Sequence, residues 1–204
     1  TTREFFSQLS RVWPDAAERQ AMAEVVATEP ARQARGAEVL ARTPVFDALL
    51  RNGVSAAIVS GGIRSNVIPT EATATLNVRT LPGAALEDVI GRLRAAVDDG
   101  QVEFRVVEES EDAPASDFHS AMFRAVADAT HAADPELTVV PYMSTGATDS
   151  ARLRKLGIQA FGILPFPMDQ NDEDRMHGHD ERVPIASLGF GVRVIYGAIV
   201  RVAK

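Results

Sequence analysis

The sequence predicts two parts, an α+β part followed by an α/β part, and two observations carry that prediction. Over residues 54–109 the apolar pattern indicates strand, strand, helix and strand, the back part of a ferredoxin-like unit that lacks its first strand and helix. After an acidic stretch at 108–117, helices and strands alternate to the C-terminus, which is typical of part of an α/β sheet with parallel pairing. We therefore expect one domain over residues 1–110 and a second over 113–204.

Composition narrows the class of protein. The 204 residues include 28 acidic and 21 basic side chains, and the net charge of −7 disfavours a dedicated nucleic-acid binder, because such proteins usually show a basic face. The chain has no cysteine, which excludes disulfides, thiolate metal sites and a cysteine nucleophile. We find no signal peptide at Thr1 and no apolar run long enough to span a bilayer, and we expect no membrane partner. The protein is expected to be cytoplasmic, unless a targeting signal precedes Thr1.

Four helices are expected before the first strand. The first, which begins with a capping box at Thr1 and ends at Pro14, has apolar residues at helical spacing. Alanine-rich helices are expected at 15–28 and 30–42, and a short helix over 44–52.

The period then changes to that of strands. Residues 54–60 are expected to form one strand, and from Val67 onward apolar and polar residues alternate, which predicts a half-buried strand with a polar face. An amphipathic helix is expected over 85–98, and the last strand of this part over 101–109.

The second part has the alternation of an α/β fold. Strands are expected at 137–142 and 158–164, and the helices at 117–133, at 148–155 and from Leu188 to Val202. Because a parallel sheet is covered by helices on both faces, the apolar faces of these two strands must be covered by a neighbour or lie open.

Three clusters of residues could carry chemistry. In the first, Asn66 lies beside a glycine-rich turn and Arg79 lies on the polar face of the strand that follows. A guanidinium group there could bind a carboxylate through its planar fork. The alternative is a turn-forming asparagine and a solvated arginine.

The second cluster is the turn Ser144–Asp149. Small residues such as Gly146, between a strand and a helix N-terminus, expose backbone N–H groups that attract an anion. The alternative is an ordinary helix cap by Thr148 or Asp149.

The third cluster is the histidine-containing stretch Met176–Glu181. His177 and His179 could supply imidazole to a divalent cation, but a zinc site needs three or four ligands. The other histidines, His119 and His131, lie far away along the chain on an expected helix. The alternative is therefore a structural histidine.

Taken in order, three stretches resemble the M20 family of metallopeptidases and amidohydrolases: GGIRSNVIPTEATATLNVRTLPG, STGATDSARL and MHGHDERVPI. The family includes carboxypeptidases, aminoacylases and desuccinylases. The resemblance implies an α/β catalytic domain with two zinc ions, interrupted by a ferredoxin-like lid domain that usually mediates dimerisation. It covers only the C-terminal portion of that architecture: residues 1–110 correspond to a partial lid, and 113–204 to the last part of the catalytic domain.

The same resemblance assigns roles to five residues. His177 is implied as a metal ligand, because the family pattern is a histidine followed three and four residues later by Asp or Asn and by Glu. Asn66 and Arg79 correspond to lid residues that bind the substrate carboxylate, often in the partner subunit's site. Gly146 and Thr148 correspond to a loop that lines the substrate pocket.

The chain also departs from the family pattern. It has no HxD motif, and its one adjacent glutamate pair, Glu108-Glu109, lies in the acidic hinge. We therefore expect a fragment of a zinc-dependent hydrolase that cleaves amide bonds of N-acyl amino acids or short peptides. This fragment is expected to be inactive alone, with no catalytic residue and at most one zinc ligand, and to form a homodimer through the lid. The alternative is a non-catalytic dimerisation module, or one that binds a small carboxylate.

Overall fold

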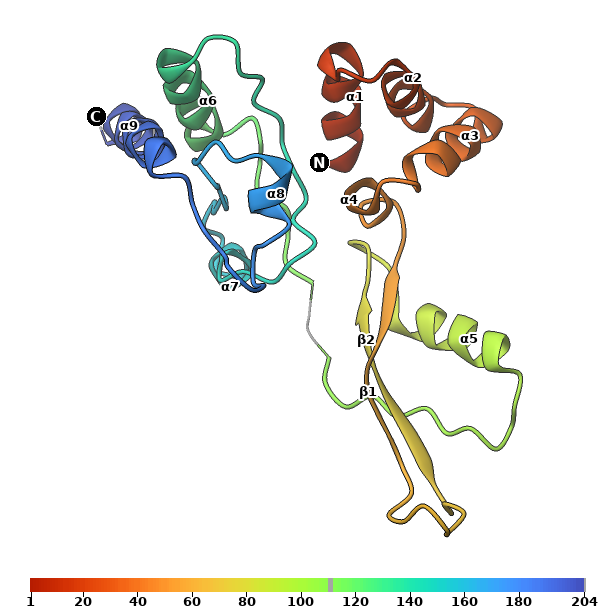
Figure 1. Ribbon diagram of the computed structural model, residues 1–204. Coiled ribbons are helices and arrows are strands. Elements are labelled where there is room, and N and C mark those ends of the chain that lie inside the picture. The colour runs from red at the N-terminus through yellow and green to blue at the C-terminus, as the bar shows by residue number, and fades with distance from the viewer. Residues whose placement is uncertain (110–111, 204) are drawn as a thin grey trace. The chain divides into compact units, whose positions relative to one another are not determined.

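The computed structural model describes residues 1–109 and 112–203, and the chain separates into two compact units (Figure 1). One unit comprises Trp13–Asp112, and the other joins Thr1–Val12 to Ala113–Lys204. The division near residue 112 falls within the expected acidic hinge, of which residues 110 and 111 lie outside the described residues. The first helix belongs to the C-terminal unit, which differs from the expected domain of residues 1–110.

Contacts of helix α1 (Thr2–Val12) explain this difference. The Phe5 ring lies 5.5 Å from the Tyr142 ring, and the Thr2 hydroxyl donates a hydrogen bond to the Met143 sulfur at 3.8 Å. Helical spacing shows that a helix has an apolar side but does not show which segment covers it. The partner segment of α1 was therefore not predictable from its own sequence.

Helices α2 (Ala16–Val25), α3 (Pro30–Leu40) and α4 (Pro44–Asp47) confirm the helical expectations for this region. Helices α2 and α3 meet at Gly36, where a Cβ atom would lie 2.5 Å from the Ala21 carbonyl oxygen. Only glycine permits so close an approach of the two backbones. Their apolar cluster consists of Ala21, Met22, Leu40, Phe46 and Leu49.

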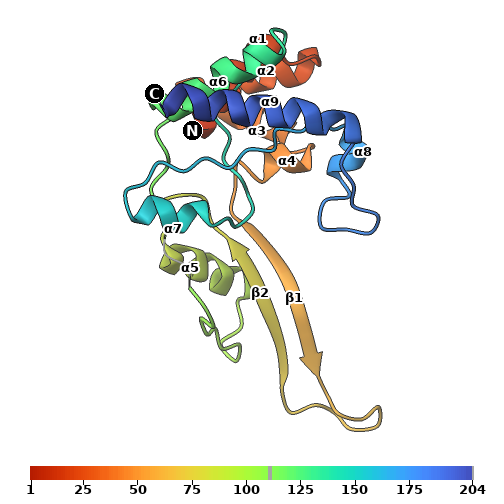
Figure 2. The ribbon, with the colours of Figure 1, turned by 90° about the vertical axis from the view of Figure 1, so that its left-hand side faces the viewer.

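Strands β1 (Gly53–Gly61) and β2 (Ala72–Arg79) form an antiparallel hairpin (Figure 2). A bulge between Ala56 and Ile58 shifts the side-chain alternation of β1, so that apolar residues of both strands share one face. These residues are Val54, Ala56, Val59, Ala74, Leu76 and Val78. The face is exposed except at Val78, which is half-buried, so the expected half-buried strand is open on both sides.

Helix α5 (Leu86–Val97) confirms the expected helix, and among its residues Val89 is buried. Among the described residues, no Cα atom of α5 lies within 8 Å of a Cα atom of either strand of the hairpin. The segment that follows α5 lies near it, because the Arg94 guanidinium is 5.8 Å from the centre of the Phe104 ring. The ferredoxin-like arrangement therefore stays a prediction.

The expected strands at 101–109, 137–142 and 158–164 are wrong, because the structure gives these segments no strand. A strand forms where a neighbour pairs with its N–H and C=O groups, and no neighbour does so within residues 1–109 and 112–203. The described chain thus combines helices with one small antiparallel sheet, which is compatible with α+β. The expected parallel α/β sheet is absent from it.

Helices α6 (Ala121–Ala133) and α9 (Ile185–Val202) form the main packing of the C-terminal unit (Figure 2). Their contact is built from small residues, Ala125, Ala129 and Ala198. With 18 residues and a mean hydropathy of 1.6, α9 is long and apolar enough to cross a membrane by length and composition alone. This corrects our expectation that no apolar run reaches that length. Within its own unit, 22% of the helix is buried.

Candidate functional site

His177 lies in the loop between α8 (Gln170–Glu173) and α9. Its side chain is exposed and its backbone is left-handed, with φ of 61°, as is that of Asp180, with φ of 60°. A left-handed non-glycine residue costs about 1–3 kcal/mol and persists only where surrounding contacts hold it. Two such residues within four positions indicate that the loop is held in one particular shape.

Two arginines hold this loop through ion pairs. Arg175 Nη1 lies 2.8 Å from Asp180 Oδ2, and Arg182 Nη1 lies 3.3 Å from the same oxygen. Arg182 Nε donates to Asp172 Oδ1 at 2.6 Å, and this hydrogen bond, followed by the charge of Asp172, raises the pKa of Arg182. The network connects the residues on both sides of His177 to α8.

The metal donors near His177 do not complete a zinc site. No group of three or more histidine, cysteine, aspartate or glutamate side chains placed to hold a metal ion occurs among the described residues. His179 is exposed in the same loop, and the Asp180 carboxylate is paired with two guanidinium groups. Zinc takes three or four protein ligands, so these residues supply at most one ligand of such a site.

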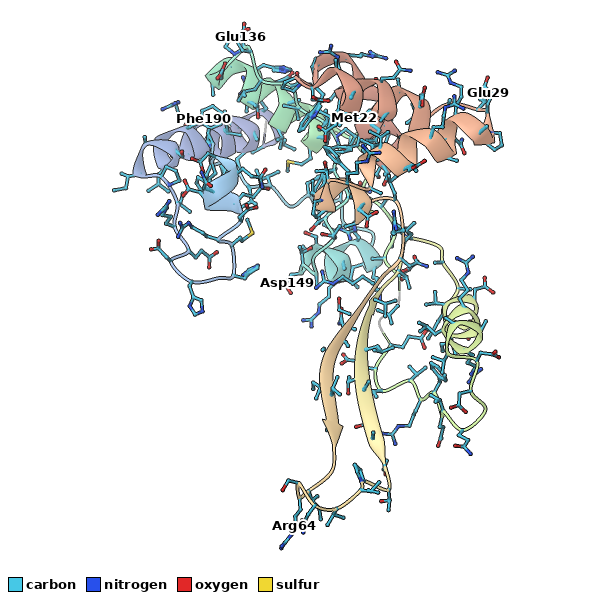
Figure 3. The ribbon with its side chains drawn as sticks, turned by 45° about the vertical axis from the view of Figure 1, so that its right-hand side comes forward. Met22, Glu29, Arg64, Glu136, Asp149 and Phe190 are labelled. Carbon is cyan, nitrogen blue, oxygen red and sulfur yellow. The ribbon has the colours of Figure 1, made fainter. Side chains whose placement is uncertain are left out.

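The turn before α7 (Ser150–Lys155) leaves Gly146 and Thr148 exposed. The Gly146 N–H donates to Ser144 Oγ at 3.2 Å. Asp149, labelled in Figure 3, precedes the helix but its side chain accepts no capping hydrogen bond. The carboxylate cap considered as the alternative for this residue is therefore not formed.

Tyr142 brings the segment before this turn close to α8. Partial burial, and secondly the charge of Glu173, raise the pKa of the Tyr142 hydroxyl.

Asn66 and Arg79 lie at opposite ends of the hairpin. Asn66 is in the loop that joins β1 to β2, whose tip is marked by Arg64 in Figure 3, whereas Arg79 pairs with Gly53 at the far end of the ladder. The seven steps from Ala72 to Arg79 span about 23 Å at 3.3 Å per residue. Both side chains are exposed, and the structure does not bring them together.

Two cavities of the C-terminal unit lie away from all these residues. The larger, about 270 Å³, is lined by Ala129, Ala132, Ala133, Arg193, Gly197 and Arg201. The smaller, about 160 Å³, is mainly apolar and is lined by α6, α9 and Phe161. The candidate site therefore consists of exposed loops and not of either cavity.

Arg175 and Arg182 are the residues of the site that the sequence analysis missed. They stand five positions before and two positions after Asp180. Basic residues on both sides of an acidic residue in a short loop are a signal for ion pairing. That signal does not by itself say which carboxylate is bound, because Asp172, Asp174, Asp180 and Glu181 are all close in sequence.

Comparison with known proteins links these motifs to one family. Residues 11–201 match the model of peptidase family M20/M25/M40. The chain is 32% identical over 148 residues to the probable carboxypeptidase S-like 2 of Dictyostelium discoideum, covering 72% of this chain and 28% of that protein. It is 27% identical over 161 residues to the human N-fatty-acyl-amino acid synthase/hydrolase PM20D1, covering 78% and 32%.

A bacterial relative shows the same partial coverage. The putative succinyl-diaminopimelate desuccinylase DapE of Mycobacterium tuberculosis is 29% identical over 145 residues, which cover 71% of this chain and 37% of that protein. No solved structure matches the chain. The matched segment is about a third of the length of these curated relatives, whereas the family match runs through nearly all of the chain and both of its units. The chain belongs to peptidase family M20/M25/M40.

Proposed function

We propose that this chain is the C-terminal portion of a zinc-dependent hydrolase that cleaves amide bonds of N-acyl amino acids or short peptides. The observation that carries the proposal is the family match over residues 11–201, which includes all three motif stretches. The names of the relatives point the same way: one is a synthase/hydrolase of N-fatty-acyl-amino acids and another is a desuccinylase. Hydrolases of this family are generally zinc-dependent.

In this proposal His177 is the one zinc ligand of the chain. Its imidazole is exposed and lies on a turn that ion pairs hold in shape, so it is accessible to a metal held by further ligands. Because the described residues do not complete a zinc site, we assign no catalytic step to them. The 204 residues alone are proposed to be inactive.

The lid residues are proposed to bind the substrate carboxylate, with Arg79 as the main contact. A guanidinium group offers paired N–H donors that match a carboxylate. Since β2 spans about 23 Å from Ala72 to Arg79 and Asn66 lies in the loop before Ala72, the two side chains of one chain do not reach the same carboxylate. Asn66 is therefore proposed to contact a different substrate, and Gly146 and Thr148 to line the pocket.

Homodimerisation through the domain of residues 1–110 is also part of the proposal. The apolar face of the hairpin supports it, because on that face Val59 is 75% exposed and Val54 is 47% exposed. Apolar surface of this kind gains free energy when a partner covers it.

The experiment that tests the proposed function compares two proteins. One is the 204-residue chain, and the other is a polypeptide from the same gene extended upstream to the length of the relatives. Both are assayed for zinc content and for hydrolysis of N-acetyl amino acids, N-fatty-acyl amino acids and dipeptides. We expect zinc and hydrolysis only in the extended protein. If the extended protein binds no zinc and cleaves none of these substrates, the proposed hydrolase function is wrong. The alternative, a non-catalytic module that binds a small carboxylate, would then be the better interpretation.

Replacing Arg79 with alanine in the extended protein is expected to raise KM about 10- to 100-fold with little change in kcat. The reason is that a hydrogen bond to a charged group is worth about 1.5–3 kcal/mol. When this contact is lost equally from the bound substrate and from the transition state, KM rises and kcat does not change. Steady-state kinetics measures both constants. Arg92→Ala, an exposed arginine on α5 of the same unit, is the control and should leave KM unchanged. An unchanged KM in Arg79→Ala would mean that this side chain is merely solvated.

A further inference from the structure

The turn that carries His177 is closed by a side chain and not only by its backbone. We call residues 175–180 the His177 turn. At its start the Arg175 carbonyl accepts the Gly178 N–H at 2.8 Å, and the Arg175 guanidinium spans the turn to bind Asp180 at its end. A Cβ atom at position 178 would lie 3.2 Å from the Arg175 carbonyl oxygen, so the turn is tightly wound.

The second guanidinium fixes the turn to the rest of its unit. Arg182 binds the same Asp180 oxygen as Arg175 and also binds Asp172, whose side chain is only 11% exposed. Asp172 is itself at the start of α8, where its N–H donates to the capping carboxylate of Asp169 at 2.9 Å. Arg182 therefore connects Asp180 to the capped helix α8.

These ion pairs act on the loop and not on overall stability. The Asp180 side chain is 69% exposed, and an exposed pair typically contributes little to the free energy of unfolding. The strain of left-handed backbone at His177 and Asp180 is likewise local. Contacts of this strength are sufficient to decide the conformation of a six-residue turn but not whether the unit folds.

We propose that Asp180 is a positioning residue: its carboxylate, held by Arg175 and Arg182, orders the turn that carries the His177 imidazole. Its Oδ2 oxygen accepts from two guanidinium groups and is thus not available as a zinc ligand. The inference rests on the proposed function insofar as His177 is the ligand that Asp180 positions. The shape of the turn itself is independent of that role.

The test measures the backbone order of the turn in the 204-residue chain. Heteronuclear {¹H}–¹⁵N NOE values of residues 176–180 are compared with those of α8. Arg175→Met keeps residue 180 and the aliphatic part of residue 175 but removes the guanidinium, and Asp180→Ala removes the carboxylate. In both variants the NOE values of the turn are expected to fall to those of a flexible loop, with an unchanged melting temperature.

Two further variants separate positioning from other effects. Asp180→Asn keeps an oxygen acceptor and the tolerance of left-handed backbone, and should restore most of the order. Asp174→Ala removes a neighbouring carboxylate that accepts from Gln170 at 2.8 Å, and should leave the turn as it is. If the turn is already flexible in the unsubstituted chain, or stays ordered in Arg175→Met and Asp180→Ala, the inference is overturned.

Zinc binding by the extended protein supplies the second readout. Each of the two exposed ion pairs shifts an equilibrium by no more than about fivefold. Asp180→Ala is therefore expected to raise the zinc dissociation constant several-fold, at most about 25-fold, and an unchanged constant would refute the positioning role. If the unsubstituted extended protein binds no zinc, the proposed function fails, while the NOE comparison still decides whether Asp180 orders the turn.

Discussion

Replacing His177 with alanine in the extended protein is expected to remove most of the bound zinc and to lower amide hydrolysis more than 100-fold. Loss of an outer-shell partner already costs about 10- to 100-fold in affinity or activity, and loss of a direct ligand removes more. A zinc ion with one of its three or four protein ligands missing also has a different coordination geometry. The change acts on the metal and not on the fold, because the His177 side chain is exposed.

The measurement is metal content by mass spectrometry after gel filtration, together with the rate of hydrolysis. His179→Ala is the matched control, since this histidine is two residues away, is equally exposed and does not occupy the ligand position of the family pattern. It should retain zinc and most of the activity. Full activity with undiminished zinc in His177→Ala would show that the assignment of the ligand is wrong.

Replacing Met22 with alanine is expected to destabilise the helical cluster of α2, α3 and α4 by about 2–5 kcal/mol. The Met22 side chain is 0% exposed, and Leu40 of the neighbouring helix α3 is equally buried, so truncation leaves a cavity that the backbones cannot close. At Gly36 the two helices already touch. Since domains are typically stable by only about 5–15 kcal/mol, this change removes a large fraction of the total.

The chain provides its own probe for this measurement. Trp13 is the one tryptophan, its ring centre lies 5.4 Å from that of Phe46, and its indole N–H donates to Glu18 at 2.6 Å. Urea unfolding followed by Trp13 fluorescence therefore reports on this cluster. Gln20→Ala, an exposed position of α2, should change the free energy of unfolding by no more than about 0.5 kcal/mol. If the urea midpoint of Met22→Ala equals that of Gln20→Ala, Met22 does not belong to the core of this helical cluster.

Most helices were predicted correctly because the signals that mark a helix lie within its own segment. Pro30 and Pro44 lie in the first turns of α3 and α4, and the 3.6-residue period marked α5 and α9. A helix satisfies its hydrogen bonds within one segment, so a local pattern is sufficient to predict it. The hairpin was also predictable in outline, because β1 and β2 are close in sequence.

The candidate site was predicted only as separate motifs. The sequence identified His177, Gly146 and Arg79, but it did not show that Asn66 and Arg79 lie at opposite ends of the hairpin. It also did not show which carboxylate each arginine of the His177 loop binds. Both are matters of pairing and distance, which residue types alone do not fix.

The sequence by itself determined the family, the positions of the helices other than α8 and the order of the three motifs. Only the tertiary structure decided that α1 packs with Tyr142 and Met143 and that Asp180 is bound by two arginines. It also decided that the segments expected as strands at 137–142 and 158–164 remain unpaired among the described residues. The physical reason is that helical hydrogen bonds follow a fixed local spacing, whereas strand pairing and helix docking join residues distant along the chain. For the ion pairs, several carboxylates lie within reach of each arginine, and only the folded loop selects one of them.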